Sequence, residues 1–371
     1  MKYRDVELYY QQTLDNVGTK IIDLRTTDPI SAIRLTFFGT NDATFNKENY
    51  LNDVITKIEL VDGSDQLLSL TLKEAQALQY RLTKKMPFMR PGESASGAQE
   101  EQGLIMFGRY LWDPEYYMDL TKFRNPQLKI TTNIAAIRAS GSDGFLTGSL
   151  QVSVNLLVIQ EGAEAAKGFM MAKNIYGFTS ADSGDEHVDM PMDYPYVGLL
   201  LRAYQVGHDP MHNISAMKLN CDAGKFIPFD IRVKDLYRIE ENDLGVAELR
   251  YFIFRKDAEW VHHILTQDPH TFFNPGIPGR IAGTYTAFNG MFKFNLRAHD
   301  NTPVAAEELT SVLIKGSCPH STVYVPFGLQ ELPATYFDPK KYGDIDLILT
   351  QDDPAACAVV LVQLRPYGAA A

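Results

Sequence analysis

Short runs of apolar and β-branched residues, separated by turn residues, recur along the whole chain and are typical of β-strands. They begin at residues 19, 30, 54, 66, 103, 127 and 150 in the first half, and at residues 196, 214, 247, 290, 321, 344 and 356 in the second. Helical spacing interrupts each half only once. The pattern predicts an all-β protein built from two tandem β-sandwiches.

Both helical segments begin at a residue suited to capping a helix. TLKEAQALQYRL offers Thr71 as the N-cap, and Glu74 three residues later completes a capping box. DIRVKDLYRI offers Asp230 as the matching N-cap of the second half. We therefore expect one short helix in each sandwich.

An internal repeat supports the division into two halves. ITKIEL, which ends at Leu60, aligns with ISAMKL, which ends at Leu219, and an Asp/Gly turn follows each. The predicted caps Thr71 and Asp230 both lie 11 residues further on. Strand, turn, strand and cap therefore share one spacing.

A second pair of matching segments locates an insertion. YYMD, ending at Asp119, aligns with TYFD, ending at Asp338, and 12 residues later stand Thr131 and Thr350. The first alignment has an offset of 159 and the second an offset of 219, so the second half holds about 60 extra residues. We place this insertion at about 255–318, and such long insertions project from one end of a sandwich.

These matches divide the chain into four segments. Residues 1–16 are expected to form an N-terminal arm, and residues 17–162 the first sandwich. The acidic stretch 163–190 is rich in small residues and is interpreted as a connector. Residues 191–371, including the insertion, form the second sandwich.

The stretch FGRYLWDPEYYMDL at 107–120 has the residue types of a catalytic or sugar-binding cleft. Paired carboxylates for glycoside hydrolysis and rings for stacking on sugars would come from Asp113, Glu115, Asp119, Trp112, Tyr116 and Tyr117. A counterpart, FGLQELPATYFDP, stands at 327–339 in the second half. Because a catalytic site breaks such symmetry, we favour a structural corner in which aromatic rings cover the open end of a sandwich and Asp119 or Asp338 accepts backbone N–H bonds.

Two groups of histidines suggest weaker hypotheses. His208 and His212, with Asp209 between them, have metal-ligating side chains but no third ligand close in sequence, so no metal site is expected. His262 and His263 are adjacent and would point to opposite faces of a strand. We expect them at an interface, where protonation could tune assembly with pH.

Composition excludes several classes of function. The formal net charge of −11, without a Lys/Arg cluster, argues against direct sequence-specific binding to nucleic acid. Cys221, Cys318 and Cys357 are far apart and form no CxxC pair, which favours a reduced setting. No export signal and no apolar run near about 18 residues is found. No GxSxG, P-loop, GxGxxG or HExxH motif occurs, so neither an enzyme nor a cofactor is expected.

The chain resembles the double jelly-roll major capsid proteins of tailless icosahedral viruses, which infect bacteria, archaea and eukaryotes. The resemblance spans roughly 17–371 and rests on ISAIRLTFF, on the hairpin KIELVDGSDQLLSL before the Thr71 helix, on FGRYLWDPEYYMDLTKFRNPQLKIT, and on their counterparts in the second half. It implies two jelly rolls, each with one short helix, and a capsid protein of a bacteriophage-like virus. The alternative from another class is a double-sandwich carbohydrate-active or glycan-binding protein.

The resemblance also implies partners. Three chains would form a homotrimer of pseudo-hexagonal outline that contacts neighbouring capsomers and minor capsid and vertex (penton) proteins. Residues 1–16 would contact an internal membrane if one is present. The chain would be made in the host cytoplasm and reside in the virion shell. The loops 86–101 and 138–149 and the insertion are candidates for outer or inter-trimer contacts.

Overall fold

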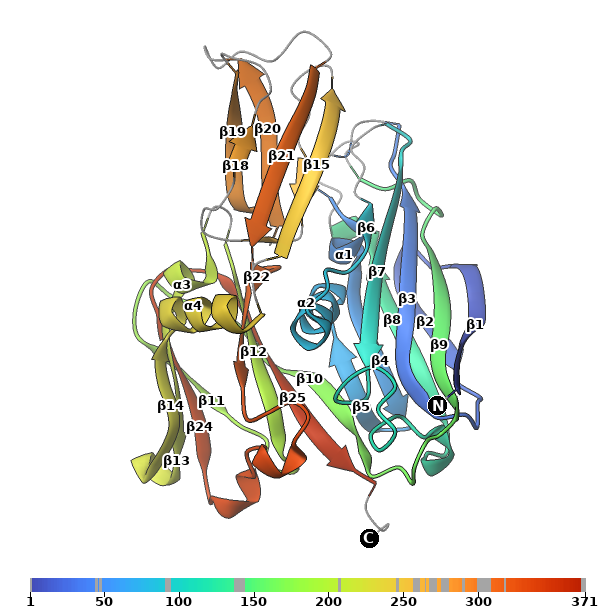
Figure 1. The fold of residues 1–371 in the computed structure, drawn as a ribbon, viewed down its shortest axis with the longest axis vertical. Coiled ribbons are helices and arrows are strands. Elements are labelled where there is room, and N and C mark those ends of the chain that lie inside the picture. The colour runs from blue at the N-terminus through green and yellow to red at the C-terminus, as the bar shows by residue number, and fades with distance from the viewer. Residues whose placement is uncertain are drawn as a thin grey trace.

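The computed structural model describes residues 2–43, 46, 49–90, 95–136, 144–205, 208–244 and 319–367, and between 247 and 318 the backbone of individual strands. Two β-sandwiches stand side by side, and the strands of a smaller unit lie beyond one end of them (Figure 1). The predicted all-β architecture of two tandem sandwiches is confirmed.

The first sandwich consists of two antiparallel sheets. One has the order β1 (Lys2–Thr13), β9 (Gln151–Glu161), β3 (Ile30–Thr40), β7 (Ala98–Met106) and β6 (Met89–Arg90). The other has the order β2 (Val17–Asp23), β8 (Pro126–Asn133), β4 (Ile55–Asp62) and β5 (Asp65–Leu70). Apolar residues alternate along β4 and β8, so one face of each strand faces the core.

The second sandwich repeats this strand order. One of its sheets runs β10 (Gly168–Thr179), β25 (Ala356–Pro366), β12 (Tyr196–Tyr204) and β23 (Thr322–Pro326). The other runs β11 (Asp185–Asp189), β24 (Ile345–Gln351), β13 (Ile214–Cys221) and β14 (Phe226–Arg232). Each strand occupies the place of one strand in the first sandwich. In chain order, β10 to β14 correspond to β1 to β5, and β23 to β25 correspond to β7 to β9. The repeat read from the sequence is therefore a repeat of topology.

The helices confirm one predicted cap and correct the other. Thr71 caps α2 (Leu72–Thr83) with the full capping box, since Glu74 N donates to Thr71 Oγ1 at 3.2 Å and Thr71 N donates to Glu74 Oε2 at 2.7 Å. Asp230 is not a cap: it lies in β14, paired with Lys218 of β13, and α4 begins only at Val233. The second hairpin is longer, which shifts the helix.

Each sandwich also carries a second, four-residue helix, so the expectation of one helix each was wrong. These are α1 (Leu51–Val54) before β4 and α3 (Pro210–Asn213) before β13. Short 3-10 turns are η1 (Leu120–Lys122), η2 (Ile134–Ala136), η3 (Asp222–Gly224), η4 (Pro333–Thr335) and η5 (Pro339–Lys341). Four residues are too few for an apolar period to show, so α1 and α3 left no helical signal in the sequence.

The structure corrects two of the predicted segment boundaries. Residues 2–13 of the expected arm form β1, which pairs with β9 over its length, and a membrane-contacting arm is therefore not supported. The expected connector 163–190 contains β10 and β11, so the second sandwich begins at Gly168. The small and acidic residues of 163–190 suggested a connector, but a strand with one exposed face accepts the same residue types.

The insertion begins earlier than expected and holds its own strands. These are β15 (Ala247–Arg255), β16 (Val261–His263), β17 (Leu265–Thr266), β18 (Phe272–Asn274), β19 (Arg280–Phe288), β20 (Met291–Ala298), β21 (Glu308–Gly316) and β22 (Cys318–Pro319). They form the sheets β15-β21-β18 and β16-β20-β19 and the pair β17-β22. His262 and His263 lie in β16, and their side chains are outside the described residues, as is the first half of the predicted loop 138–149. The predicted loop 86–101 contains β6 and the start of β7.

The two sandwiches are joined through their sheets. β5 and β10 pair in parallel at Ser69 and Lys173, which makes one eight-stranded sheet. Leu199 and Leu201 of β12 lie in the core of the second sandwich, whereas Leu200 between them packs into the core of the first. β12 and β25 therefore bury both faces, which explains their continuous apolar sequences.

Candidate functional site

The passage at 107–120 folds as a corner held by backbone hydrogen bonds. Phe107 N donates to Ser31 O at 3.0 Å, and Ile30 and Met118 exchange two N–H···O bonds of 2.9 Å each. Gly108 lies so close to the opposite side of the corner that a Cβ there would be 2.6 Å from Tyr116 O. Only glycine fits this position.

The passage at 327–339 repeats these contacts. Phe327 N donates to Val197 O at 2.9 Å, and Tyr196 and Phe337 exchange bonds of 2.8 and 3.2 Å. Gly328 has a φ of +140°, and a Cβ there would lie 2.6 Å from Thr335 O. The shared FG dipeptide thus has one steric cause in both sandwiches.

The two aspartates predicted as backbone acceptors both act in this way. Asp119 Oδ1 accepts from Thr121 N at 3.0 Å and caps η1, while Asp338 Oδ1 accepts from Lys340 N at 3.2 Å and caps η5. Each turn leads into a strand that starts seven residues after its aspartate, β8 at Pro126 and β24 at Ile345. Both passages are therefore structural corners.

Two of the three carboxylates considered for catalysis, Asp113 and Glu115, are held in ion pairs. Arg109 reaches Asp113 through Nε at 2.6 Å and a second nitrogen at 2.9 Å, and Asp113 is fully buried. Burial favours a higher pKa for Asp113, but the Arg109 guanidinium and backbone N–H donors outweigh it and hold that pKa below its ordinary value. Glu115 pairs with Arg109 at 2.8 Å and with Lys167. Paired with cations in this way, neither Asp113 nor Glu115 is suited to act as the proton donor in glycoside hydrolysis.

The aromatic side chains of the corner are also engaged. Trp112 stacks on Tyr3 of β1 with ring centroids 4.3 Å apart, and the Tyr116 ring lies 4.6 Å from the Arg109 guanidinium. Tyr117 is buried and donates to Glu164 O at 2.7 Å. Tyr3 covers one face of the Trp112 ring, so the glycan-binding alternative gains no support.

The two corners contact each other, which the sequence did not reveal. Arg109 donates to Glu331 O at 3.0 Å, and Gln330 donates to Arg109 O. Arg109 thus ties the first corner to the second across 222 positions of sequence. The only sequence signal for it was its place four residues before Asp113.

A second cluster of polar groups lies buried between the sandwiches. We call Asp53, Lys73, Gln76, Glu101 and His320 the polar seam. Lys73 Nζ lies 2.5 Å from Asp53 Oδ1, Gln76 Nε2 donates to Glu101 Oε2 at 3.3 Å, and His320 Nε2 lies 2.7 Å from Gln76 Oε1. Since an amide oxygen only accepts, His320 donates from Nε2. The seam links α1, α2 and β7 of the first sandwich to the second.

Solved structures of known proteins match this arrangement over the whole chain. The major capsid protein of the Sulfolobus turreted icosahedral virus has a TM-score of 0.58 at 11% identity, covering 98% of this chain and 97% of that chain. The major capsid protein P2 of bacteriophage PM2 scores 0.55 at 9% identity, with 99% and 98% covered. VP54 of PBCV-1 scores 0.57 at 9% identity, with 100% and 97% covered. The fold is a double jelly roll.

At these identities the matches establish the fold and nothing finer. No protein-family model matches the sequence, and no curated protein matches it. The double jelly roll explains why strand order and corners occur twice. In the described part of the chain, no helix is both long and apolar enough to cross a membrane.

Two groups of the polar seam titrate away from their ordinary ranges. Burial raises the pKa of Glu101 to about 7. Burial, with the positive charges of Lys73 and Arg202, lowers the pKa of His320 well below its ordinary value. His320 is therefore neutral at the centre of the double jelly roll at physiological pH.

His320→Gln is expected to reduce acid sensitivity. An unfolded His320 takes up a proton below about pH 6.5 and the folded one does not, so its contribution to stability is present above that pH and lost as pH falls. Glu101 acts with the opposite sign, because its contribution is lost as pH rises through about 7. Comparing variant with wild type isolates the histidine. When the pH is lowered from about 7.5 to about 5, the unfolding free energy of the wild type should fall by about 2 kcal/mol more than that of the variant, as measured in urea. Equal changes in both proteins would contradict this.

The structure brings the other candidate ligands only partly together. The rings of His208 and His212 lie 6.2 Å apart, and His208 Nδ1 lies 3.1 Å from Asp353. Among the described side chains, no three His, Cys, Asp or Glu residues form a metal-binding group. Cys221 and Cys357 are free and buried in the double jelly roll.

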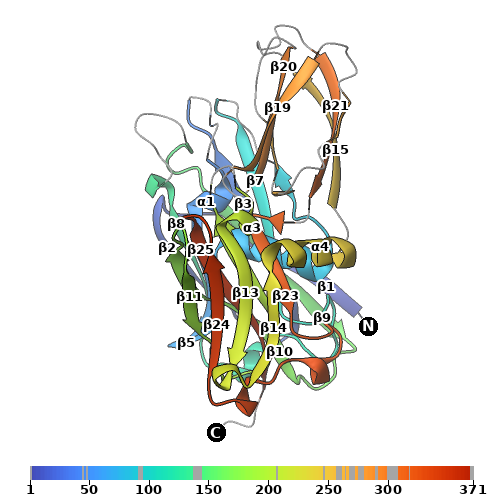
Figure 2. The same ribbon diagram turned by 90° about the vertical axis from the view of Figure 1, so that its left-hand side faces the viewer.

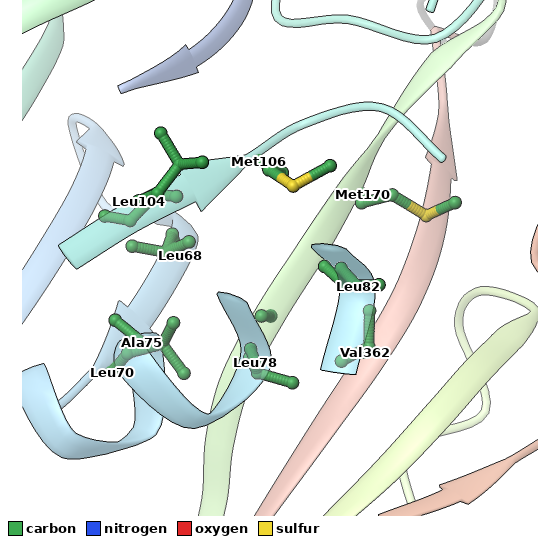
Figure 3. Close-up of a pocket in the computed structure, with 11 residues that line it drawn as sticks. Leu68, Leu70, Ala75, Leu78, Leu82, Leu104, Met106, Met170 and Val362 are labelled. Atoms are coloured by element: carbon green, nitrogen blue, oxygen red, sulfur yellow. The ribbon is translucent and has the colours of Figure 1, made fainter. Parts of the chain in front are cut away.

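An apolar void of about 20 Å³ lies where the two jelly rolls pack together. Figure 3 shows Leu78 and Leu82 of α2 and Met106 of β7 facing Met170 and Val362 of the second jelly roll. The space is about that of one water molecule and its lining is apolar, so it is a packing defect and not a ligand site.

Proposed function

We propose that this chain is the major capsid protein of an icosahedral virus and that three copies form a capsomer of six jelly rolls. The observation that carries the proposal is the full-length match to major capsid proteins of three different viruses. The corners and the seam have structural roles, which fits a building block better than an enzyme. The chain would reside in the virion shell after assembly in the host cytoplasm.

A difference between the two equivalent helices supports a binding surface for another copy. Nine of the twelve residues of α2 are buried, because the second jelly roll covers the side that the first leaves open. In α4 (Val233–Leu244), Val233 and Leu236 are buried, whereas Ile239 is 47% exposed. The surface of α4 that corresponds to the covered side of α2 is therefore open in a single chain.

The sheet edges show the same difference. β5 is covered by β10, but its counterpart β14 is the last strand of its sheet and exposes Phe226 and Ile227. On the opposite flank, β1 is also an edge strand (Figure 1). Figure 2 views the flank that carries β14, with α4 above it. Each chain thus has two open flanks, one formed by β14 and α4 and the other by the edge strand β1.

These flanks fit a head-to-tail contact between copies. The β14 and α4 flank of one chain would bind the β1, β9 and β3 sheet of the next, as β5 and α2 bind the second jelly roll within one chain. A head-to-tail contact closes into a ring when its rotation permits. Because each chain supplies two jelly rolls, three chains would complete a ring of six.

Further partners follow from the same role. Trimers would contact neighbouring capsomers and minor capsid and vertex proteins, through the insertion and the loops at 86–101 and 138–149. Sequence-specific binding to nucleic acid is not part of the proposal, given the net charge of −11.

Size-exclusion chromatography with light scattering tests the assembly. We expect trimers in solution and shells or flat arrays by electron microscopy at high protein concentration. A monomer at every concentration, with no ordered particle, would contradict the proposed function.

A further inference from the structure

The polar seam brings a lysine amine and a carboxylate together in a place shielded from water. Lys73 in α2 and Asp53 in α1 are 7% and 18% exposed at the side chain, and Nζ lies 2.5 Å from Oδ1. Figure 1 shows α1 next to α2 and β7, and Glu101 of β7 is completely buried in the same cluster. Asn52 Nδ2 donates to Glu101 Oε2 at 3.0 Å. An amine, a carboxylate and a second carboxyl group therefore share one buried site.

Two oxygens of this site are unsatisfied. Asp53 Oδ2 and Glu101 Oε1 are both buried and, among the described residues, have no hydrogen-bond partner. Native proteins rarely leave buried polar atoms without a partner. A buried ion pair is also costly, because the loss of hydration of both ions can exceed their attraction. The arrangement is poor as a permanent salt bridge.

We propose that Lys73 and Asp53 are joined by an intramolecular amide bond, formed by the folded chain itself with Glu101 carrying the proton. The bond would staple α1 to α2 beneath the insertion and beside the contact between the two jelly rolls. It would replace two buried charges with one neutral amide.

The reaction balances without any further reagent. A bond forms between Lys73 Nζ and Asp53 Cγ, and one Cγ–O bond of Asp53 breaks. The lysine ammonium has three protons; one stays on the amide nitrogen, and two leave with the carboxylate oxygen as water. No electrons are exchanged with another molecule.

The surroundings favour each proton movement. Burial lowers the pKa of Lys73, against the attraction of Asp53, which favours the nucleophilic neutral amine. Burial raises the pKa of Glu101 to about 7, so this side chain can take a proton from Nζ and return it to the departing oxygen at neutral pH. Holding amine and carboxyl in contact supplies the large effective concentration that such a reaction needs.

The mass of the denatured full-length protein tests the bond directly. We expect the wild type to be lighter than its sequence by one water. After proteolysis, a single branched peptide should contain both Asp53 and Lys73. A full sequence mass together with separate linear peptides for the two residues would overturn the proposal. The measurement does not depend on oligomeric state, so it can fail while the capsid function holds.

Three variants assign the roles. Lys73→Arg keeps the positive charge but removes the nucleophile, and we expect the full sequence mass. Glu101→Gln can still accept the Asn52 hydrogen bond but cannot carry a proton, and we expect the full mass with an unchanged circular dichroism spectrum. Glu100→Gln is the matched control on the opposite face of β7 and should keep the bond. A branched peptide in Glu101→Gln would exclude Glu101 as the proton carrier, and loss of water in Lys73→Arg would show that it comes from another site.

Discussion

Arg109→Met is expected to lower the free energy of unfolding by about 3–5 kcal/mol, which is the usual cost of leaving one partner of a buried ion pair behind. Arg109 is almost completely buried, and its removal would leave the fully buried Asp113 carboxylate without its cation. The carbonyl of Glu331 in the second corner would also lose a hydrogen bond. Both jelly rolls would be affected by one substitution.

Urea unfolding followed by circular dichroism measures this effect. The control is Arg25→Met, since Arg25 is 84% exposed and pairs with Asp23, and its loss should cost no more than about 1 kcal/mol. Adding Asp113→Asn to Arg109→Met should recover part of the loss, because the unpaired charge disappears while an acceptor for backbone N–H groups remains. If Arg109→Met were as stable as the control Arg25→Met, Arg109 would not hold the corners together.

A double variant, Phe226→Asp with Ile239→Asp, is expected to convert the trimer into a folded monomer. These side chains are 46% and 47% exposed on the open flank formed by β14 and α4. Burying a new charge in place of an apolar contact should cost about 2 kcal/mol or more at each site, so association should weaken by about a thousandfold.

Light scattering across a range of concentrations measures the change in assembly. Leu146→Asp is the control, since Leu146 is also 46% exposed but lies outside that flank. It should remain a trimer. A double variant that stays trimeric would show that the copies associate through another surface, while leaving the fold unaffected.

The sequence predicted the parts of this protein that local physics controls. The capping box at Thr71 depends on residues three positions apart, and the turns at Asp119 and Asp338 depend on neighbours two positions away. The repeat exposed the equivalent corners because one strand order imposes the same spacing twice. Local rules failed at Asp230, which suits a helix cap in sequence but belongs to β14, since its strand extends to Arg232.

The sequence by itself determined the fold class, the two-fold repetition and the structural nature of the corners, because these follow from short-range spacing. Only the tertiary structure decided which surfaces meet. The run of apolar residues around Leu200 does not reveal that one face of β12, in the second jelly roll, packs into the core of the first. Nor does the sequence place Lys73, Asp53 and Glu101 in one buried site or join Arg109 to Glu331. Such contacts depend on how two sandwiches pack, and that packing is set by complementary shapes and charges that no local pattern records.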